Sequence, residues 1–441
     1  MLSVLIWIIA TTGGRQVFVK EVLGEAFDSQ AQHFLSGDVD VDGSAIRWEG
    51  MVVNGKARMY FGPFPALLRM PLNLIYPAGR GAWSRISGFL AAELALFAFA
   101  GLLTDALKTS ALSPRKRTWF GSACLVGFVF GTPLILLFGN PSIYNEAITW
   151  AFAWSVAALF FAWHSRNAAG RALIISLVGF SICSGASLLS RLTYGAPLVL
   201  VAALLAFLLI REKKFSLLPA LLAPLSICLV IHLWLSYARF GNFTGVNFDN
   251  YVNSVHREFA QKHGMFSLRR APYNAADYFG FRLPPFQNRP PFLKADRHYY
   301  PHPELYSIPS SETYLPVTWA ATWLFAGGFL GAICLFRKNC ADFFERGTAA
   351  ALACQTLMIL SYYTLSRRYS VDLYPFLIIC FMIFLRRWPS LLTRIYPVPI
   401  VLVALSVTIN SLATISWLAE ADQNVRPETH AFYNQLLGRS K

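Results

Sequence analysis

The sequence predicts an all-α polytopic membrane protein with about eleven transmembrane helices, on three observations. Of its 441 residues, 55% are hydrophobic and only 14% are charged, whereas soluble domains carry about 25% charged residues. The mean hydropathy is +0.46. Apolar residues occur in runs of roughly 20, the helix length that crosses the hydrocarbon core of a bilayer. This composition excludes a disordered chain, collagen, a disulfide scaffold and a cytosolic enzyme.

Eleven apolar stretches are expected to form these helices. The first is too short to span a bilayer by itself and has no basic region, so it is not a convincing signal peptide. We interpret it as the end of a helix whose start lies upstream. The stretches lie near 1–12, 84–107, 118–139, 142–163, 171–188, 194–210, 216–236, 315–336, 347–365, 371–385 and 396–418.

The basic residues indicate which side each loop faces. Alternate loops contain 15 Lys and Arg against three acidic residues, which accounts for +12 of the formal net charge of +15. Such an excess marks cytoplasmic loops, so the charge is an orientation signal and predicts no nucleic-acid partner. We therefore expect a plasma-membrane protein with a cytoplasmic N-terminus and an extracytoplasmic C-terminus. The basic loops are 108–117, 164–171, 211–214, 337–346 and 386–394.

The remaining loops then face outward, and they define the expected organisation. In the first loop, the apolar segment 61–77 contains Arg69 and four prolines, so we expect a short helix in the membrane interface rather than a span. The longest loop is rich in proline and aromatic residues, which predicts a folded cap, with one helix near 248–263. The expected parts are an N-terminal membrane module (1–236) with the first loop at 13–83, the cap (237–314), a C-terminal membrane module (315–418) and an outer tail (419–441).

An active site outside the membrane has no ATP or nucleotide sugar, so its activated substrate must arrive on a lipid. Such a site needs a base near the acceptor and cations for a phosphate leaving group. Asp28 follows the first helix and is a candidate base, although an N-cap role fits its position equally well. Glu146, with Tyr144 beside it, lies at the outer end of a helix, where the helix dipole also favours an acid.

Several arginines lie at outer helix ends, where the positive-inside rule gives no reason for them. The guanidinium group binds phosphate through a planar fork of donors, while snorkelling to lipid headgroups is the alternative role. Asp372 is placed to orient one of these cations. The candidates for phosphate or substrate binding are Arg191 with Tyr194, Arg367, Arg368, Tyr369 and, more weakly, Arg239.

Together these segments resemble the polytopic GT-C glycosyltransferases that use polyprenyl-phosphate sugars, a group with bacterial aminoarabinose and arabinofuranosyl transferases. The likeness covers most of the chain loosely. It is carried by FDSQAQHFLSGD, YFGPFPALLRMP, YNEAITWAFAW, SRLTYGAPL and RRYSVDLYPFL. One departure is that many members have two acids at the first-loop position, whereas Asp28 is followed by Ser29.

The resemblance implies an inverting glycosyltransferase. Asp28 would act as the base, Glu146 as a second acid near the acceptor, and Arg191 or Arg367 and Arg368 as phosphate ligands. The expected partners are a polyprenyl-phosphate-linked sugar donor, an extracytoplasmic glycan, lipid or protein acceptor, and membrane lipid.

Two other functions remain open from the sequence: a flippase or other transporter of lipid-linked oligosaccharides, and a polymerase or ligase of surface polysaccharides. A transporter predicts charges along a midplane cavity and often inverted repeats, and the sequence has no visible repeat. A cofactor is not required by any motif. A divalent cation held by Asp28 with help from Glu146 also stays open.

Overall fold

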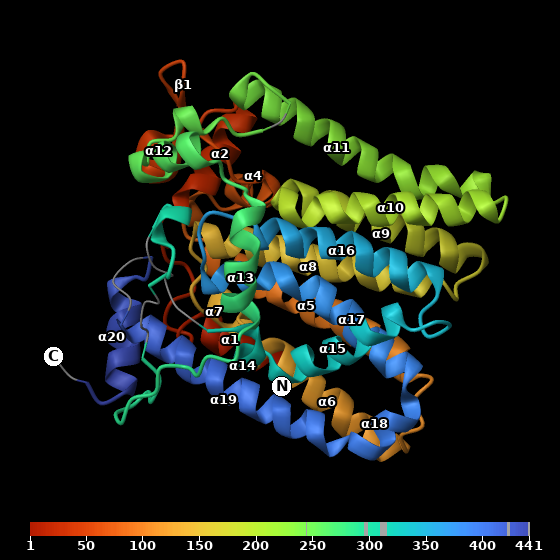
Figure 1. Cartoon of the computed structure of the whole chain (residues 1–441). Helices are drawn as coiled ribbons and strands as arrows, with labels where there is room; N and C mark the ends of the chain where they lie inside the picture. The colour runs from red at the N-terminus through yellow and green to blue at the C-terminus, as the bar shows by residue number, and fades with distance from the viewer. Residues whose placement is uncertain (244, 295–298, 309–314, 421–423, 440–441) are drawn as a thin grey trace.

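The computed structural model describes residues 1–243, 245–294, 299–308, 315–420 and 424–439 and is mainly helical (Figure 1). Parts of the expected cap and tail therefore lie outside the described residues. Among the described residues, seven helical segments are long and apolar enough to cross a membrane. They are α5 (Ser84–Leu107), α8 (Ile143–Ser165), α9 (Gly170–Ser190), α10 (Leu192–Arg211), α11 (Leu218–Phe240) with the turn before it, α17 (Tyr374–Arg387) with the turn Arg367–Leu373, and α19 (Pro397–Glu420).

The four other expected spans correspond to helices of 9 to 18 residues, so the count of eleven stays a prediction. These are α1 (Leu2–Ala10), α6 (Pro114–Phe130), α15 (Thr322–Phe336) and α16 (Phe343–Leu360). The short helices are α2 (Glu25–Leu35), α3 (Gly43–Ile46), α4 (Phe64–Ile75), α7 (Leu134–Gly139), α12 (Ser254–His263), α13 (Ala271–Phe279), α14 (Val317–Ala320), α18 (Pro389–Ile395) and α20 (Pro427–Leu436).

Some expected helix boundaries were wrong. The stretch 118–139 is two helices, α6 and α7, because the chain breaks at Gly131-Thr132-Pro133. Proline has no backbone N–H and clashes with the preceding turn, so a helix does not continue through it easily. The stretch 347–365 ends at Leu360, and 248–263 is helical in α12 only from Ser254. The short helix expected in 61–77 is confirmed as α4.

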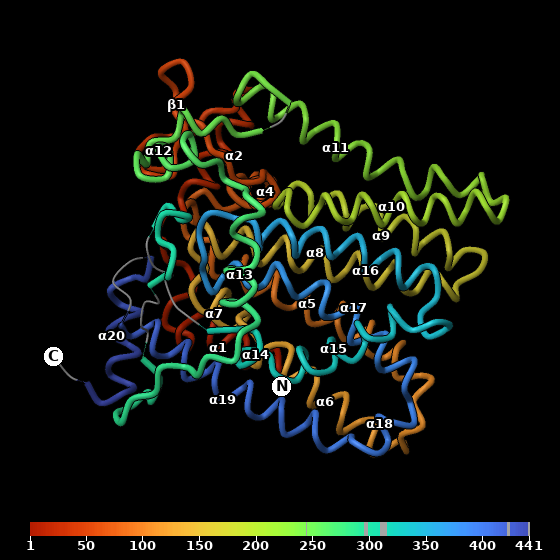
Figure 2. The backbone as a smooth tube through the Cα atoms, in the orientation of Figure 1, coloured from red at the N-terminus to blue at the C-terminus, as the bar shows by residue number. Residues whose placement is uncertain are grey.

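The long helices run side by side, and the long loops gather at one end of the bundle (Figure 1). Helices α2, α4 and α12 lie at that end, whereas the short turns between α8 and α9 and between α10 and α11 lie at the opposite end (Figure 2). The loops assigned to one side from charge therefore share one end of the molecule.

The helices differ strongly in how far they are buried, with α8 at the centre of the bundle and α11 at its edge. Helix α8 packs against α5, α9 and α10, and 78% of its apolar 18-residue stretch is buried. Helix α11 lies at the edge of the bundle against α9 and α10, and only 11% of its corresponding apolar stretch is buried. In a bilayer, the outer face of α11 would contact lipid, because its exposed residues are apolar.

Candidate functional site

A β-hairpin in the first loop brings Glu49 and Tyr60 together. Strand β1 (Gly50–Val53) pairs antiparallel with β2 (Lys56–Met59). Asn54 and Gly55 connect the strands with φ of 52° and 76°, the left-handed conformation that two-residue Asn-Gly hairpin turns require. Glu49 precedes β1 and Tyr60 follows β2, so the two residues stand at the open end of the hairpin.

Three tyrosine hydroxyls donate hydrogen bonds to the Glu49 carboxylate. Tyr144 donates to Oε1, while Tyr60 and Tyr251 donate to Oε2, each at 2.6 Å. Glu49 is 5% exposed, and no cation forms an ion pair with it in the described parts of the chain. The three phenols therefore compensate the burial of its charge.

Two of these phenols lie outside the spanning helices and stay protonated. Burial raises the pKa of Tyr60 well above its usual value, and the negative charge of Glu49 raises it further. Burial and Glu49 likewise raise the pKa of Tyr251. Both hydroxyls therefore remain hydrogen-bond donors at physiological pH.

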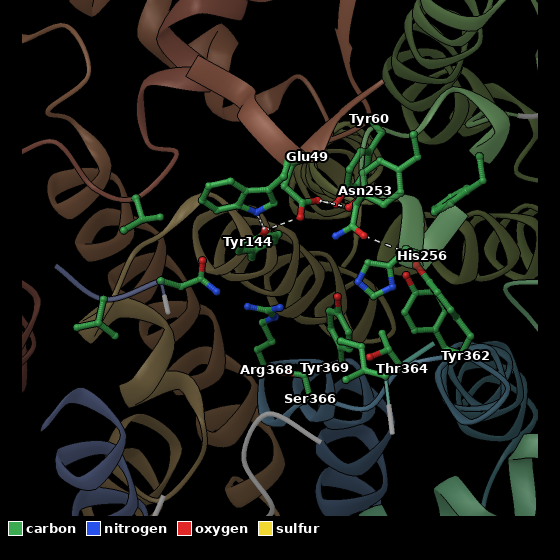
Figure 3. Close-up of a pocket in the computed structure, with 18 residues that line it drawn as sticks. Glu49, Tyr60, Tyr144, Asn253, His256, Tyr362, Thr364, Ser366, Arg368 and Tyr369 are labelled. Atoms are coloured by element: carbon green, nitrogen blue, oxygen red, sulfur yellow. Dashed lines mark hydrogen bonds between the residues drawn. The ribbon is translucent and has the colours of Figure 1, made fainter. Parts of the chain in front are cut away.

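A polar cavity of about 640 Å³ opens beside Glu49 (Figure 3), within the size range of small-molecule sites. In Figure 3, Glu49 and Asn253 lie on one side of it, and Arg368 and Tyr369 on the opposite side. Its walls come from the first loop, the start of α8, the long loop and the segment after α16. The labelled lining residues are Glu49, Tyr60, Tyr144, Asn253, His256, Tyr362, Thr364, Ser366, Arg368 and Tyr369.

A second cavity of about 340 Å³ adjoins the first and is mainly apolar. We call it the apolar groove. It lies between the outer ends of α11 and α16, with the start of α10 also in its lining. The polar cavity and the apolar groove share five aromatic residues in their linings, so the two spaces lie next to each other. The shared residues are Tyr60, Tyr144, Phe248, Tyr362 and Tyr369.

Two arginines line the apolar groove. Arg239, in the last turn of α11, is 5% exposed, and its Nη1 donates to the Phe61 carbonyl oxygen at 3.1 Å. Its Nε and Nη2 are buried and have no hydrogen-bond partner among the described residues. Arg191 lies 3.6 Å from Oδ2 of Asp372. A buried guanidinium without a carboxylate is costly unless an anion binds to it.

No protein-family model and no curated protein matches the sequence. Among solved structures, the chain is similar to ArnT from Cupriavidus metallidurans bound to undecaprenyl phosphate, with 12% sequence identity and a TM-score of 0.50. That match covers 99% of this chain and 76% of the ArnT chain. ArnT in the apo state also matches, with 12% identity, 90% of this chain, 78% of that chain and a TM-score of 0.34.

The fold is GT-C-like. The resemblance read from the sequence is thus confirmed at the level of the fold. The seven segments of the described residues that are long and apolar enough to cross a membrane agree with a multi-pass membrane protein.

Within the GT-C-like fold, Asp28 and Glu146 lie together but line neither cavity. Arg69 bridges them: its Nη1 is 3.0 Å from Asp28 Oδ2, and its Nη2 is 2.7 Å from Glu146 Oε2. Asn73 donates to the other Asp28 oxygen at 2.8 Å, and Ser87 donates to Glu146 at 2.7 Å. All three charged groups are buried, so the network ties α2 and α4 to α8.

Arg367 and Arg368, both predicted to bind phosphate, point into different parts of the structure. Arg368 lines the polar cavity, and its guanidinium carbon lies 4.4 Å from the centre of the Tyr144 ring. Tyr369 also lines both spaces, between Arg368 and Arg191 at 5.5 and 5.1 Å from its ring centre. Arg367 instead turns into the bundle, where its Nη2 donates to Asn410 Oδ1 at 2.9 Å.

The other predicted residues around Arg191 support its position. Asp372 is 1% exposed and accepts a hydrogen bond from Thr193 at 3.2 Å. Tyr194 is fully buried and does not line either cavity. Arg191, Arg239, Arg368, Tyr144 and Tyr369 are thus the predicted residues that the fold brings to the two adjoining cavities.

Glu49, Tyr60 and Tyr251 were not among the residues predicted from the sequence. A signal existed for the first two, because Asn54-Gly55 between alternating apolar residues predicts a hairpin with Glu49 and Tyr60 at its ends. Tyr251 carried no such signal. It reaches Glu49 because the long loop pairs with the hairpin, where the Val252 amide donates to the Gly50 carbonyl oxygen at 3.0 Å.

A divalent cation held by Asp28 and Glu146 would need the space that Arg69 already occupies. The Arg69 guanidinium already lies between the two carboxylates and neutralises part of their charge. Within the described ranges, no group of three or more His, Cys, Asp or Glu side chains has the spacing to hold a metal ion.

Proposed function

We propose that this protein is a membrane glycosyltransferase that transfers a sugar from a polyprenyl-phosphate donor to an extracytoplasmic acceptor. The observation that carries the proposal is that the apolar groove lies directly beside the polar cavity. A polyprenyl-phosphate sugar has an apolar chain joined through phosphate to a polar ring, and the two adjoining spaces match these two parts. The undecaprenyl phosphate bound to ArnT, which has the same fold, agrees with this reading.

The donor phosphate would bind at Arg239, with Arg191 beside it. Arg239 offers two buried N–H-bearing nitrogens without partners among the described residues, and both arginines line the apolar groove. Charge-assisted hydrogen bonds from guanidinium to phosphate are strong and directional. They would also stabilise the negative charge that develops on the phosphate as the sugar leaves.

The sugar and the acceptor would occupy the polar cavity. Sites for small molecules combine aromatic walls with a few placed polar groups, and this cavity has tyrosines together with Glu49, Asn253, His256 and Arg368. Because nucleotide sugars are absent outside the cell, a lipid-linked donor fits a site at the loop end of the bundle. The basic connectors at the opposite end would then face the cytoplasm.

The test is sugar transfer by the purified full-length protein, with radiolabelled polyprenyl-phosphate sugars as donors and a membrane lipid extract as the source of acceptors. We expect wild-type transfer and a fall in kcat/KM of about 10- to 100-fold for Arg239→Ala, the loss typical of one hydrogen-bonded charge. Arg269→Ala, an exposed arginine of the long loop, is the matched control and should retain full activity.

Arg239→Lys separates the effect of the charge from that of the donor geometry, because it keeps the positive charge but loses the planar fork. We expect an activity between those of the wild type and Arg239→Ala. Movement of the donor across vesicles without any transfer would instead indicate the flippase function. Equal activity of Arg239→Ala and the wild type would remove Arg239 from the phosphate site.

A further inference from the structure

Glu49 is a buried carboxylate with one hydrogen-bonding position left open. An ionised carboxylate has about four lone-pair positions on its two oxygens. Tyr60 and Tyr251 fill two positions at Oε2, and Tyr144 fills one at Oε1. One position therefore remains at Oε1, and Glu49 is the carboxylate of the polar cavity's lining.

We propose that Glu49 is the general base of the transfer reaction and that its open position receives the acceptor hydroxyl. This assignment rests on the proposed glycosyltransferase function and names a residue for it. The phenols hold the carboxylate at the cavity wall, so Oε1 is fixed in place to accept a hydrogen bond from the hydroxyl group of the acceptor. Asp28, by contrast, lines neither cavity, and its Oδ2 lies 3.0 Å from the guanidinium group of Arg69.

The reaction balances without a further co-reactant. The acceptor oxygen forms a bond to the anomeric carbon of the donor sugar while its proton passes to Glu49 Oε1. The bond between the anomeric carbon and the phosphate oxygen breaks, and its electron pair leaves with the polyprenyl phosphate. Arginine side chains stabilise that phosphate, and Glu49 afterwards releases its proton to water.

The charges around Glu49 suit a base rather than a structural ion pair. The ionisable groups bonded to it are the phenols of Tyr60, Tyr144 and Tyr251. The phenols donate hydrogen bonds and carry no charge. The cavity lining also contains ionisable side chains that do not bond to Glu49, namely His256, Tyr362, Tyr363, Arg368 and Tyr369. Because no guanidinium is bound to the carboxylate among the described residues, its open position is available to an acceptor hydroxyl group.

The experiment compares Glu49→Gln with two control carboxylates in the same loop. Glutamine keeps the size and accepts hydrogen bonds at Oε1 but cannot take the proton. We expect kcat to fall by about 100- to 10,000-fold, the range for removal of a general base, with the KM for the lipid donor nearly unchanged. Undecaprenyl phosphate should still raise the thermal stability of Glu49→Gln as it does that of the wild type.

Asp40→Asn and Asp28→Asn are the controls. Asp40 is buried and paired with Lys56 and Arg58 at 2.9 Å, but it lines neither cavity. The wild type and both controls should lose activity at low pH, as the base becomes protonated, and any residual activity of Glu49→Gln should lack this acidic limb.

Each outcome decides between the alternatives. If the wild type is active and Glu49→Gln retains activity within a few-fold, or keeps the acidic limb, Glu49 is not the base and the glycosyltransferase function stands. If Asp28→Asn alone removes the acidic limb, Asp28 is the base. A wild type without transfer from any donor in the panel would overturn the function and this assignment together.

Discussion

The Tyr251 hydroxyl donates a 2.6 Å hydrogen bond to Glu49 Oε2 across 202 residues of sequence. The bond joins the long loop to the first loop at the wall of the polar cavity. The geometry of the candidate site therefore depends on two loops, neither of which has the apolar pattern of a membrane helix.

Tyr251→Phe removes this bond while it preserves the aromatic ring. A hydrogen bond to a charged group contributes about 1.5–3 kcal/mol, so we expect sugar transfer to fall roughly 10-fold or more, because Glu49 loses one of its three supports. Tyr299→Phe, at an exposed tyrosine of the same loop, should leave transfer unchanged. Wild-type activity of Tyr251→Phe would mean that Tyr60 and Tyr144 suffice to hold Glu49.

Arg69→Met leaves Asp28 and Glu146 without their shared cation. Removal of one partner from a buried ion pair costs about 3–5 kcal/mol, because a charge stays buried without compensation. We expect a marked fall in thermal stability in detergent. Asp28→Asn should cost less, because Arg69 keeps its bond to Glu146. Arg80→Met, at an exposed site, is the control, and an Arg69→Met protein as stable as the wild type would contradict the structural role.

Gly55→Ala tests the turn that places Glu49 beside Tyr60. Its φ of +76° is unfavourable for alanine, although no atom lies within 4 Å of the added methyl group. The backbone strain should therefore cost about 1–2 kcal/mol, and transfer should fall as the hairpin loosens. Gly43→Ala also adds a methyl group to open space, but without a positive φ. Equal stability of the two variants would argue against the hairpin geometry.

Asp277, in α13, predicts a pH dependence of stability. Burial raises the pKa of its carboxyl to about 6, an effect that the charge of Arg282 partly offsets. Between its usual pKa of about 4 and this value, the folded protein binds the proton more tightly than the unfolded chain. Stability should therefore fall as the pH rises through this window. Thermal unfolding of Asp277→Asn should show a smaller fall, whereas Asp249→Asn should follow the wild type.

Much of the fold could be predicted from the sequence because lipid imposes a strong local requirement. A helix that crosses a bilayer must be long and apolar, so runs such as Ser84–Leu107 and Gly170–Ser190 are legible without tertiary information. Arg239 and Arg368 were also identifiable, because cations on the non-basic side are unusual. Pro133 also indicates a break in its helix, but the continuous apolar run around it favoured a single helix over 118–139.

The membrane class, the alternation of basic and non-basic loops and the set of residues with suitable chemistry could all be predicted from the amino-acid sequence. Which of these residues share a site depends on how the helices and loops pack. This packing placed Asp28 and Glu146 around Arg69, turned Arg367 into the bundle and Arg368 into the polar cavity, and brought Tyr251 to Glu49. The reason is physical: hydropathy acts on each segment alone, whereas a hydrogen-bonded site arises from loops whose contacts depend on the whole packed bundle.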